Sequence, residues 1–130
     1  MTRRDWLWLG AAGLGCGARR PQSDLLPETL AGWQRTAVRD VSAADAPAIV
    51  PRTVVRLIRE ADYQGSGRIT ARIYDLASDP VALDLAQRWP SKADTVVFYE
   101  RNYLVVVNWQ QADRQALHNF MRELERRLAL

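Results

Sequence analysis

The fold is decided by residues 94–109, Asp94-Thr95-Val96-Val97-Phe98-Tyr99-Glu100-Arg101-Asn102-Tyr103-Leu104-Val105-Val106-Val107-Asn108-Trp109. Two runs rich in β-branched and aromatic residues flank the dipeptide Arg101-Asn102, which is short enough to close a β-hairpin. Asparagine tolerates the positive φ that such a turn requires. The unbroken apolar run at 104–107 predicts a central strand with both faces substantially covered.

A second strand is predicted upstream, where residues 68–74 alternate between apolar and polar side chains. The turn signal Gln64-Gly65-Ser66-Gly67 precedes it. Residues 52–61 are ambiguous, because their apolar residues recur at helical spacing although several are β-branched. This segment is therefore expected to be a helix, with a strand starting at about residue 59 as the alternative.

Two helices complete the pattern. Ser78-Asp79-Pro80 is typical of a helix start, an apolar stripe follows, and Pro90 ends the helix. Residues 111–128 carry a second stripe at helical spacing. The order hairpin, helix, hairpin, helix over residues 58–89 and 94–128 predicts an α+β two-layer sandwich. In it, a four-stranded antiparallel sheet carries both helices on one face, all within a single domain at 51–130.

Residues 19–50 form a lead-in that we expect to pack on this domain. Its first residues are polar and linker-like, and residues 40–47 are expected to form a loop. Trp33 follows a short apolar turn, and a bulky aromatic residue in such a place is more often a core residue than a binding residue.

The first eighteen residues are typical of an export signal or membrane tether. Arg3 and Arg4 precede an apolar run, residues 6–15, that is far shorter than the ~20 residues a membrane-spanning helix needs. Thr2-Arg3-Arg4-Asp5-Trp6-Leu7 resembles the twin-arginine translocation signal, with Arg3 and Arg4 as the arginine pair, Trp6 where phenylalanine is usual, and Leu7 matching. The resemblance implies export in a folded state, to the periplasm or a membrane-attached site in the cell envelope.

Cys16 is the only cysteine, so an intrachain disulfide is excluded. Its position after the apolar run resembles the lipobox of bacterial lipoproteins, although Gly13 stands where leucine is expected. The resemblance implies a lipid anchor on Cys16. There are two alternatives to this lipid anchor. The chain could be cleaved after Ala18, which would release the domain, or the segment could stay uncleaved as a hydrophobic tether.

The composition points to an ordinary globular protein, with a formal net charge of +3, 48% hydrophobic and 25% charged residues. The sequence contains no basic block interleaved with aromatic residues, the pattern that would indicate nucleic-acid binding. The single histidine, His118, has no metal-ligand motif around it, and no serine has a nucleophile-elbow setting. The carboxylate pairs Glu60/Asp62 and Glu123/Glu125 are interpreted as solvated surface. We therefore expect no enzymatic activity and no cofactor.

Residues 25–128 also resemble exported bacterial domains of unknown function, through the Leu-Pro…Gly-Trp lead-in, the Tyr-x-Gly-x-Gly turn at 63–67 and the aromatic-rich hairpin at 98–107. This resemblance implies no activity. We expect an exported, membrane-tethered accessory or protein-interaction domain, binding an unidentified envelope protein complex, with Arg101 and Tyr103 as contacts for the partner. The alternative is a small-ligand or cofactor-binding domain that uses an apolar space between Trp89, Trp109 and Phe120.

Overall fold

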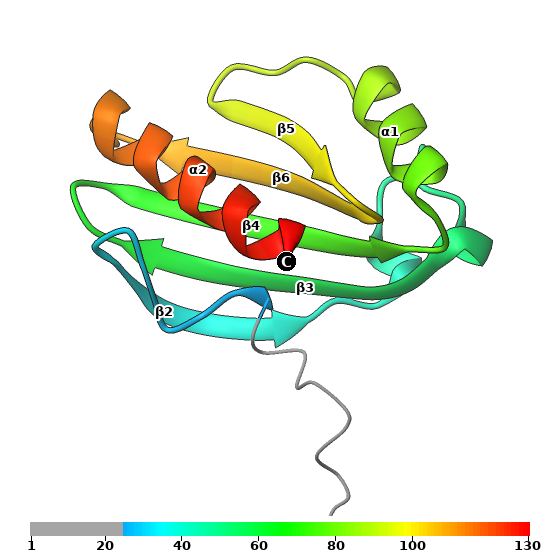
Figure 1. The fold of residues 1–130 in the computed structure, drawn as a ribbon, viewed down its shortest axis with the longest axis horizontal. Coiled ribbons are helices and arrows are strands. Elements are labelled where there is room, and N and C mark those ends of the chain that lie inside the picture. The colour runs from blue at the N-terminus through cyan, green and yellow to red at the C-terminus, as the bar shows by residue number, and fades with distance from the viewer. Residues whose placement is uncertain (1–24) are drawn as a thin grey trace, which may run out of the picture.

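The computed structural model describes residues 25–130, which form one antiparallel sheet and two α-helices (Figure 1). The six strands are ordered β1-β2-β3-β4-β6-β5 in the sheet. Their bounds are β1 Thr29–Leu30, β2 Trp33–Asp40, β3 Val55–Gln64, β4 Arg68–Leu76, β5 Thr95–Glu100 and β6 Tyr103–Gln110. The helices are α1, Asp79–Arg88, and α2, Arg114–Ala129, with two short 3-10 turns, η4 Ala43–Asp45 and η5 Arg52–Val54. The export-signal residues Arg3, Arg4, Trp6 and Leu7 and the lipidation candidate Cys16 lie outside the described residues.

The predicted four-stranded, two-layer sandwich is wrong, because the sheet has six strands and curls into a half-barrel. The strands that the prediction lacked come from the lead-in. β2 pairs with β3 along its whole length, although a register shift between Arg35 and Ala37 interrupts the alternation of its side chains. Most β2 residues are also solvent-exposed, and the two-residue strand β1 pairs only with its first two residues, so no apolar pattern marks β2. Residues 55–64 are all strand, so the helix expected over 52–61 is wrong and the alternative, a strand from about residue 59, is closer.

The secondary structure predicted from β4 onward agrees with the observed elements. The alternating strand at 68–74, the hairpin at 94–109 and both helices are confirmed. Ser78 caps α1 by accepting a hydrogen bond from the backbone N–H of Val81, and Asp113 caps α2 in the same way through Ala116. Local capping and periodicity therefore set these elements as the sequence indicates.

The two helices pack on opposite faces of the sheet, so the prediction that they share one face is wrong. Successive strand side chains point to opposite faces. On β6, Val105 and Val107 belong to the apolar cluster that includes α2, whereas Leu104 and Val106 belong to the cluster that includes α1. The expectation that both faces of 104–107 are covered is confirmed, because all four residues are buried.

Trp33 lies at the centre of the cluster around α2 (the α2 core). Its side chain is 2% exposed, and its indole Nε1 donates a hydrogen bond of 3.2 Å to the carbonyl of Ala116. The ring meets Phe120 edge-on at 6.1 Å between centroids. A Cβ at Gly65 would lie 2.8 Å from the indole, so the β3–β4 turn needs a glycine here. The interpretation of Trp33 as a core residue is confirmed.

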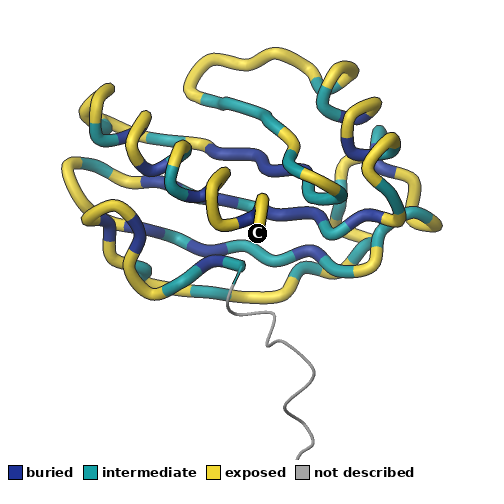
Figure 2. Tube along the Cα trace, in the orientation of Figure 1, coloured by how far each residue is buried: buried dark blue, intermediate teal, exposed yellow. Residues whose placement is uncertain are grey.

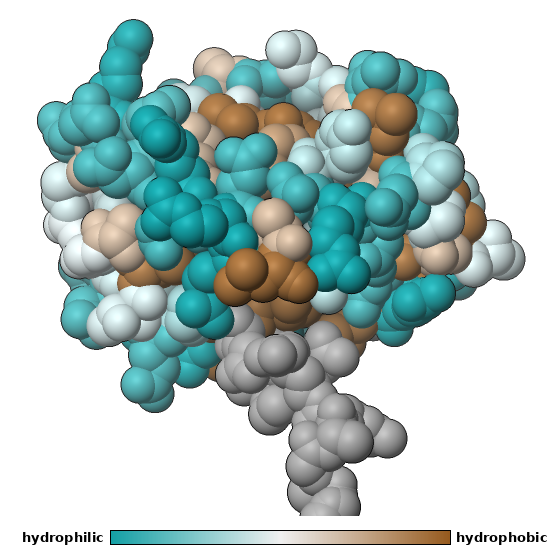
Figure 3. All heavy atoms as spheres, viewed as in Figure 1, coloured by the Kyte–Doolittle hydropathy of each residue, from teal (hydrophilic) through white to brown (hydrophobic). Residues whose placement is uncertain are grey.

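The cluster around α1 (the α1 core) covers the other face at the opposite end of the sheet. Ile58, Tyr74 and Leu104 from the strands pack there with Leu85 of α1, and Trp89 lies 5.7 Å from the Tyr74 ring. Figure 2 shows the buried residues running along β3, β4 and β6, with exposed residues on the outer sides of the helices. From the α2 side, hydrophilic residues cover the helix, and hydrophobic surface gathers near β5 and the C-terminus (Figure 3). On the α1 face, the apolar cluster occupies one end of the sheet, and the other end, next to the β3–β4 turn, is left uncovered.

Candidate binding groove

The uncovered half of the α1 face forms an open groove of about 660 Å³. Its floor comes from neighbouring strands, and one wall comes from the segment that joins α1 to β5. The side chains that point to this face, or belong to that wall, are almost all polar. We call this surface the polar groove; it comprises Thr36, Asp62, Gln64, Arg68, Thr70, Lys92, Asp94, Thr95, Asn108 and Gln110.

The position of the groove follows from strand register. Asp62 lies opposite Thr70 on β4, and Thr70 lies opposite Asn108 on β6. Residues paired in this way point to the same face. Since Tyr63 and Ile69, one position along, are buried in the α2 core, their neighbours face the side that α2 does not cover. The sheet thus holds the groove side chains on rigid, paired backbone.

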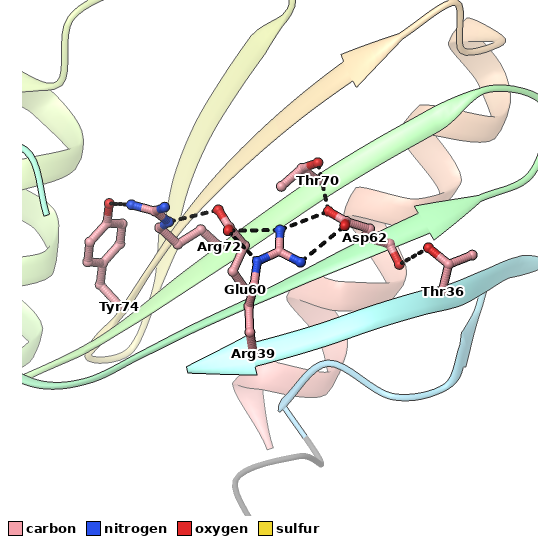
Figure 4. A network of polar contacts seen from close by, with 7 residues as sticks. All are labelled: Thr36, Arg39, Glu60, Asp62, Thr70, Arg72 and Tyr74. Carbon is pink, nitrogen blue, oxygen red and sulfur yellow. Dashed lines mark hydrogen bonds and ion pairs between the residues drawn. The ribbon is translucent and has the colours of Figure 1, made fainter. Parts of the chain in front are cut away.

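An ion-pair network joins the groove to the α1 core (Figure 4). Arg39 of β2 forms hydrogen bonds of 2.9 Å to Glu60 and of 3.0 and 3.1 Å to the two carboxylate oxygens of Asp62. Arg72 of β4 donates to the other oxygen of Glu60 at 2.9 Å and contacts the Tyr74 hydroxyl at 3.3 Å. Thr70 donates to Asp62 at 3.1 Å. Three strands are therefore linked across the sheet by charged side chains whose partners are fixed.

The network and the burial around it shift the pKa of four of these groups. The hydrogen bond from Arg39 lowers the pKa of Asp62, outweighing partial burial, and the Thr70 hydrogen bond adds to the effect. The same hydrogen bond from Arg39 raises the pKa of Arg39. Burial acts to lower the pKa of Arg72, but its bonds to Tyr74 and Glu60 outweigh burial and raise it. Burial raises the pKa of the Tyr74 hydroxyl and so favours its uncharged form. Asp62 is thus stabilised as a carboxylate, and both acidic side chains of the network have arginine partners.

The far end of the groove differs, because its charges have no such partners. Arg68 projects from the start of β4, and Lys92 and Asp94 belong to the α1–β5 segment. All three are exposed, and within residues 25–130 none forms an ion pair or a side-chain hydrogen bond. Asp94 has a left-handed backbone with φ of 62°. This end therefore presents two cations and one anion to solvent.

The two residues predicted as partner contacts lie outside the groove. Arg101 is exposed in the β5–β6 turn and donates a hydrogen bond of 2.9 Å to the carbonyl of Leu130. Tyr103 is half-buried and packs against the α2 core. The positive φ in this turn, 57°, belongs to Arg101 and not to Asn102, whose side chain instead donates to Asp75 and Leu76.

The apolar space considered between Trp89, Trp109 and Phe120 does not unite these residues. Trp89 packs against the α1 core, whereas Phe120 belongs to the α2 core and Trp109 packs against it. The sheet lies between the two groups. His118 is exposed on α2, as expected for a solvated histidine.

The sequence interpretation missed Arg39 and Arg72, and it treated Glu60 and Asp62 only as solvated residues on one strand face. A signal for the pairing was present. Counting back from the turn at 64–68 places Glu60 opposite Arg72 and Asp62 opposite Thr70. Arg39 could not be found in this way, because its strand was not predicted.

Comparison with known protein families, curated proteins and solved structures finds no match to this chain. Within residues 25–130 no helix is long and apolar enough to cross a membrane. The same part of the chain holds no group of histidine, cysteine and carboxylate side chains that could bind a metal ion.

Proposed function

We propose that this protein is an accessory binding module of the bacterial cell envelope, exported and held at a membrane by its N-terminal segment. In this proposal a partner protein docks in the polar groove. The observation that carries it is the groove itself, because one half of one sheet face is left uncovered while the other faces of the central strands are packed into two apolar cores. Function resides in such sites more than in the fold around them.

The arrangement of the groove favours binding over chemistry. The acidic groups of the network each accept hydrogen bonds from arginine, and the bond from Arg39 lowers the pKa of Asp62. A general acid or base needs a group whose pKa lies near the working pH, and the lowered pKa of Asp62 moves away from that range. Fixed, neutralised charges on paired strands instead provide a preorganised surface.

A photo-crosslinking amino acid at Gln110 tests the groove in the cells that make the protein. Gln110 is exposed and lines the groove. The matched control carries the same crosslinker at Arg122, which is exposed on α2 on the other side of the sheet. We expect one discrete adduct from Gln110 and none of that size from Arg122. Adducts from Arg122 alone, or the same adducts from both, would contradict the groove as the docking site.

The envelope location has its own test. Replacing Arg3 and Arg4 together by lysine should retain the protein in the cytoplasm if the pair acts as a twin-arginine signal. Cys16→Ser should release the domain from membranes if Cys16 carries a lipid, and mass spectrometry of the native chain should then show an acyl adduct on that residue. Normal export of the double lysine variant contradicts the twin-arginine proposal. A mature chain that begins at Arg19 contradicts the anchor.

A further inference from the structure

We infer that the polar groove recognises an acidic, extended peptide segment of its partner. This inference rests on the proposed function and deepens it, because it specifies the chemistry of the docking segment. The relevant observation is the uneven distribution of compensated charge along the groove. At the network end each carboxylate is matched by arginine, whereas at the far end Arg68 and Lys92 have no partner within the described residues.

The unmatched cations define what the ligand must supply. Among the ionised side chains that line the groove, Asp62 is paired with Arg39 from outside it, which leaves Arg68, Lys92 and Asp94. Two positive charges and one negative charge give this end a net charge of +1. A carboxylate-bearing ligand gains from this field, and a cationic ligand does not.

The remaining lining residues suit a polypeptide backbone. Gln64 and Gln110 present side-chain amides that both donate and accept hydrogen bonds. The Thr95 hydroxyl donates to Oδ1 of Asn108 at 2.6 Å, and the Thr36 hydroxyl donates to the Asp62 carbonyl at 3.4 Å. The Asn108 N–H groups and the lone pairs of both hydroxyls are left for a ligand. These residues belong to β2, β3, β6 and β5, so a ligand that satisfies them must extend across the strands. The large apolar residues among the described residues that line the groove are Tyr63, Ile69 and Trp109, and the side chains of all three pack on the α2 side of the sheet. Recognition therefore depends on charge and on hydrogen bonds.

Asp94 provides an internal check on the inference, because among residues 25–130 it is the one anion at this end without an ion-pair partner. Its left-handed φ of 62° is tolerated by asparagine as well as by aspartate. Asp94→Asn thus removes the charge while keeping the backbone. If an acidic segment binds here, this variant should bind it more tightly than the unmodified protein does.

The experiment measures binding of a fluorescein-labelled Glu/Ser decapeptide to the full chain in detergent by fluorescence anisotropy, at low and at physiological ionic strength. The double variant Arg68→Gln/Lys92→Gln should weaken binding by about tenfold, since each exposed ion pair contributes up to about a fivefold change in affinity. Asp94→Asn should strengthen it by about two- to fivefold. The matched control is Arg52→Gln/Arg122→Gln, which makes the same change in net charge at exposed positions outside the groove and should leave the affinity unchanged.

Several results would overturn the inference. They are equal loss of affinity in the control double variant, tighter binding of a Lys/Ser decapeptide, or no binding of the acidic peptide at low salt. Binding of an oligogalacturonate in preference to the peptide would assign the groove to acidic glycans instead. The crosslinking at Gln110 remains an independent test: a discrete adduct there, together with failure of the acidic peptide, keeps the docking site and rejects only its charge preference.

Discussion

Replacing Trp33 by phenylalanine should destabilise the protein far more than the same change at Trp109. The substitution removes the hydrogen bond from the indole to Ala116, which is worth about 0.5–1.5 kcal/mol. It also leaves a gap in a site that is 2% exposed, for which a partial truncation costs about 1–2 kcal/mol. The Ala116 carbonyl stays within α2 and keeps its helical partner, so no further penalty is expected. The sum is about 1.5–3.5 kcal/mol.

Urea unfolding followed by far-UV circular dichroism measures this change without depending on indole fluorescence. With a slope of about 1–3 kcal/mol per molar urea, the midpoint should fall by about 1–2 M and the slope should stay constant. Trp109→Phe is the control, because Trp109 is only half-buried and its indole forms no hydrogen bond within the described residues. A midpoint shift for Trp33→Phe no larger than that of the control would refute the reasoning.

A double-mutant cycle with Gly65 sharpens the test. In the unmodified protein, a methyl group at residue 65 would lie 2.8 Å from Cε3, 2.9 Å from Cδ2 and 3.3 Å from Cζ3 of Trp33. Phenylalanine keeps a Cδ2 atom but lacks the outer part of the benzo ring, so the substitution relieves part of this overlap. Gly65→Ala should therefore cost less in the Trp33→Phe background than alone, with a coupling of about 1 kcal/mol. Strict additivity would show that the indole does not set the requirement for glycine.

Three further predictions concern the turn and the pH dependence of stability. Gly67→Ala should destabilise the protein by about 1–3 kcal/mol in urea unfolding, since its methyl group would lie 2.5 Å from the backbone oxygen of Gln111; a neutral result would contradict this steric requirement. The pKa of Asp62 is lower in the folded state, so the stability it contributes is present above its unfolded pKa and is lost as the pH falls through the folded value. Asp62→Asn should therefore flatten the acid side of the curve of unfolding free energy against pH. An unchanged acid side would contradict the role of Arg39. Burial raises the pKa of Asp75, so its effect on stability has the opposite sign to that of Asp62. The free energy of unfolding decreases as the pH rises from the unfolded pKa of this carboxyl to its folded pKa. Asp75→Asn should therefore unfold at an equal or higher urea concentration than the unmodified protein at pH 7. A clear loss of stability in this last variant would show that the ionised carboxylate is needed to accept the hydrogen bond from the side chain of residue 102.

The elements from β4 onward could be predicted because each has a local signal. Alternation marks β4, two β-rich runs around a dipeptide mark the β5–β6 hairpin, and Ser78 with Pro80 marks the start of α1. β2 has no such signal, since the exposure of most of its residues and its register shift remove the alternation. Its place in the sheet is set by tertiary pairing with β3, which overrides local pattern.

The arrangement of the helices was partly encoded in the sequence. Residues 104–107 are all apolar, which indicates cover on both faces, and cover on both faces requires something to pack on each. Placing both helices on one face left that requirement unmet. The polar network was hidden for a related reason: Glu60, Asp62 and Arg72 can be paired from the hairpin turn, but Arg39 reaches them only through a strand that was not predicted.

The α1 core and the α2 core use residues of the same strands, but no buried residue belongs to both clusters. This separation affects how the protein tolerates substitutions in its interior. A void opened beside Phe120 faces away from Leu85, with the backbone of β4 and β6 between them. A change of side-chain packing in one core therefore does not reach the other core through side-chain contacts. Buried residues of one helix can be substituted without compensating substitutions on the other face of the sheet. The groove borders the α2 core through the strand backbone, whereas side chains of Glu60 and Arg72 connect it to Tyr74 of the α1 core. Its geometry is therefore insulated from substitutions around α2 but is coupled to those around Tyr74.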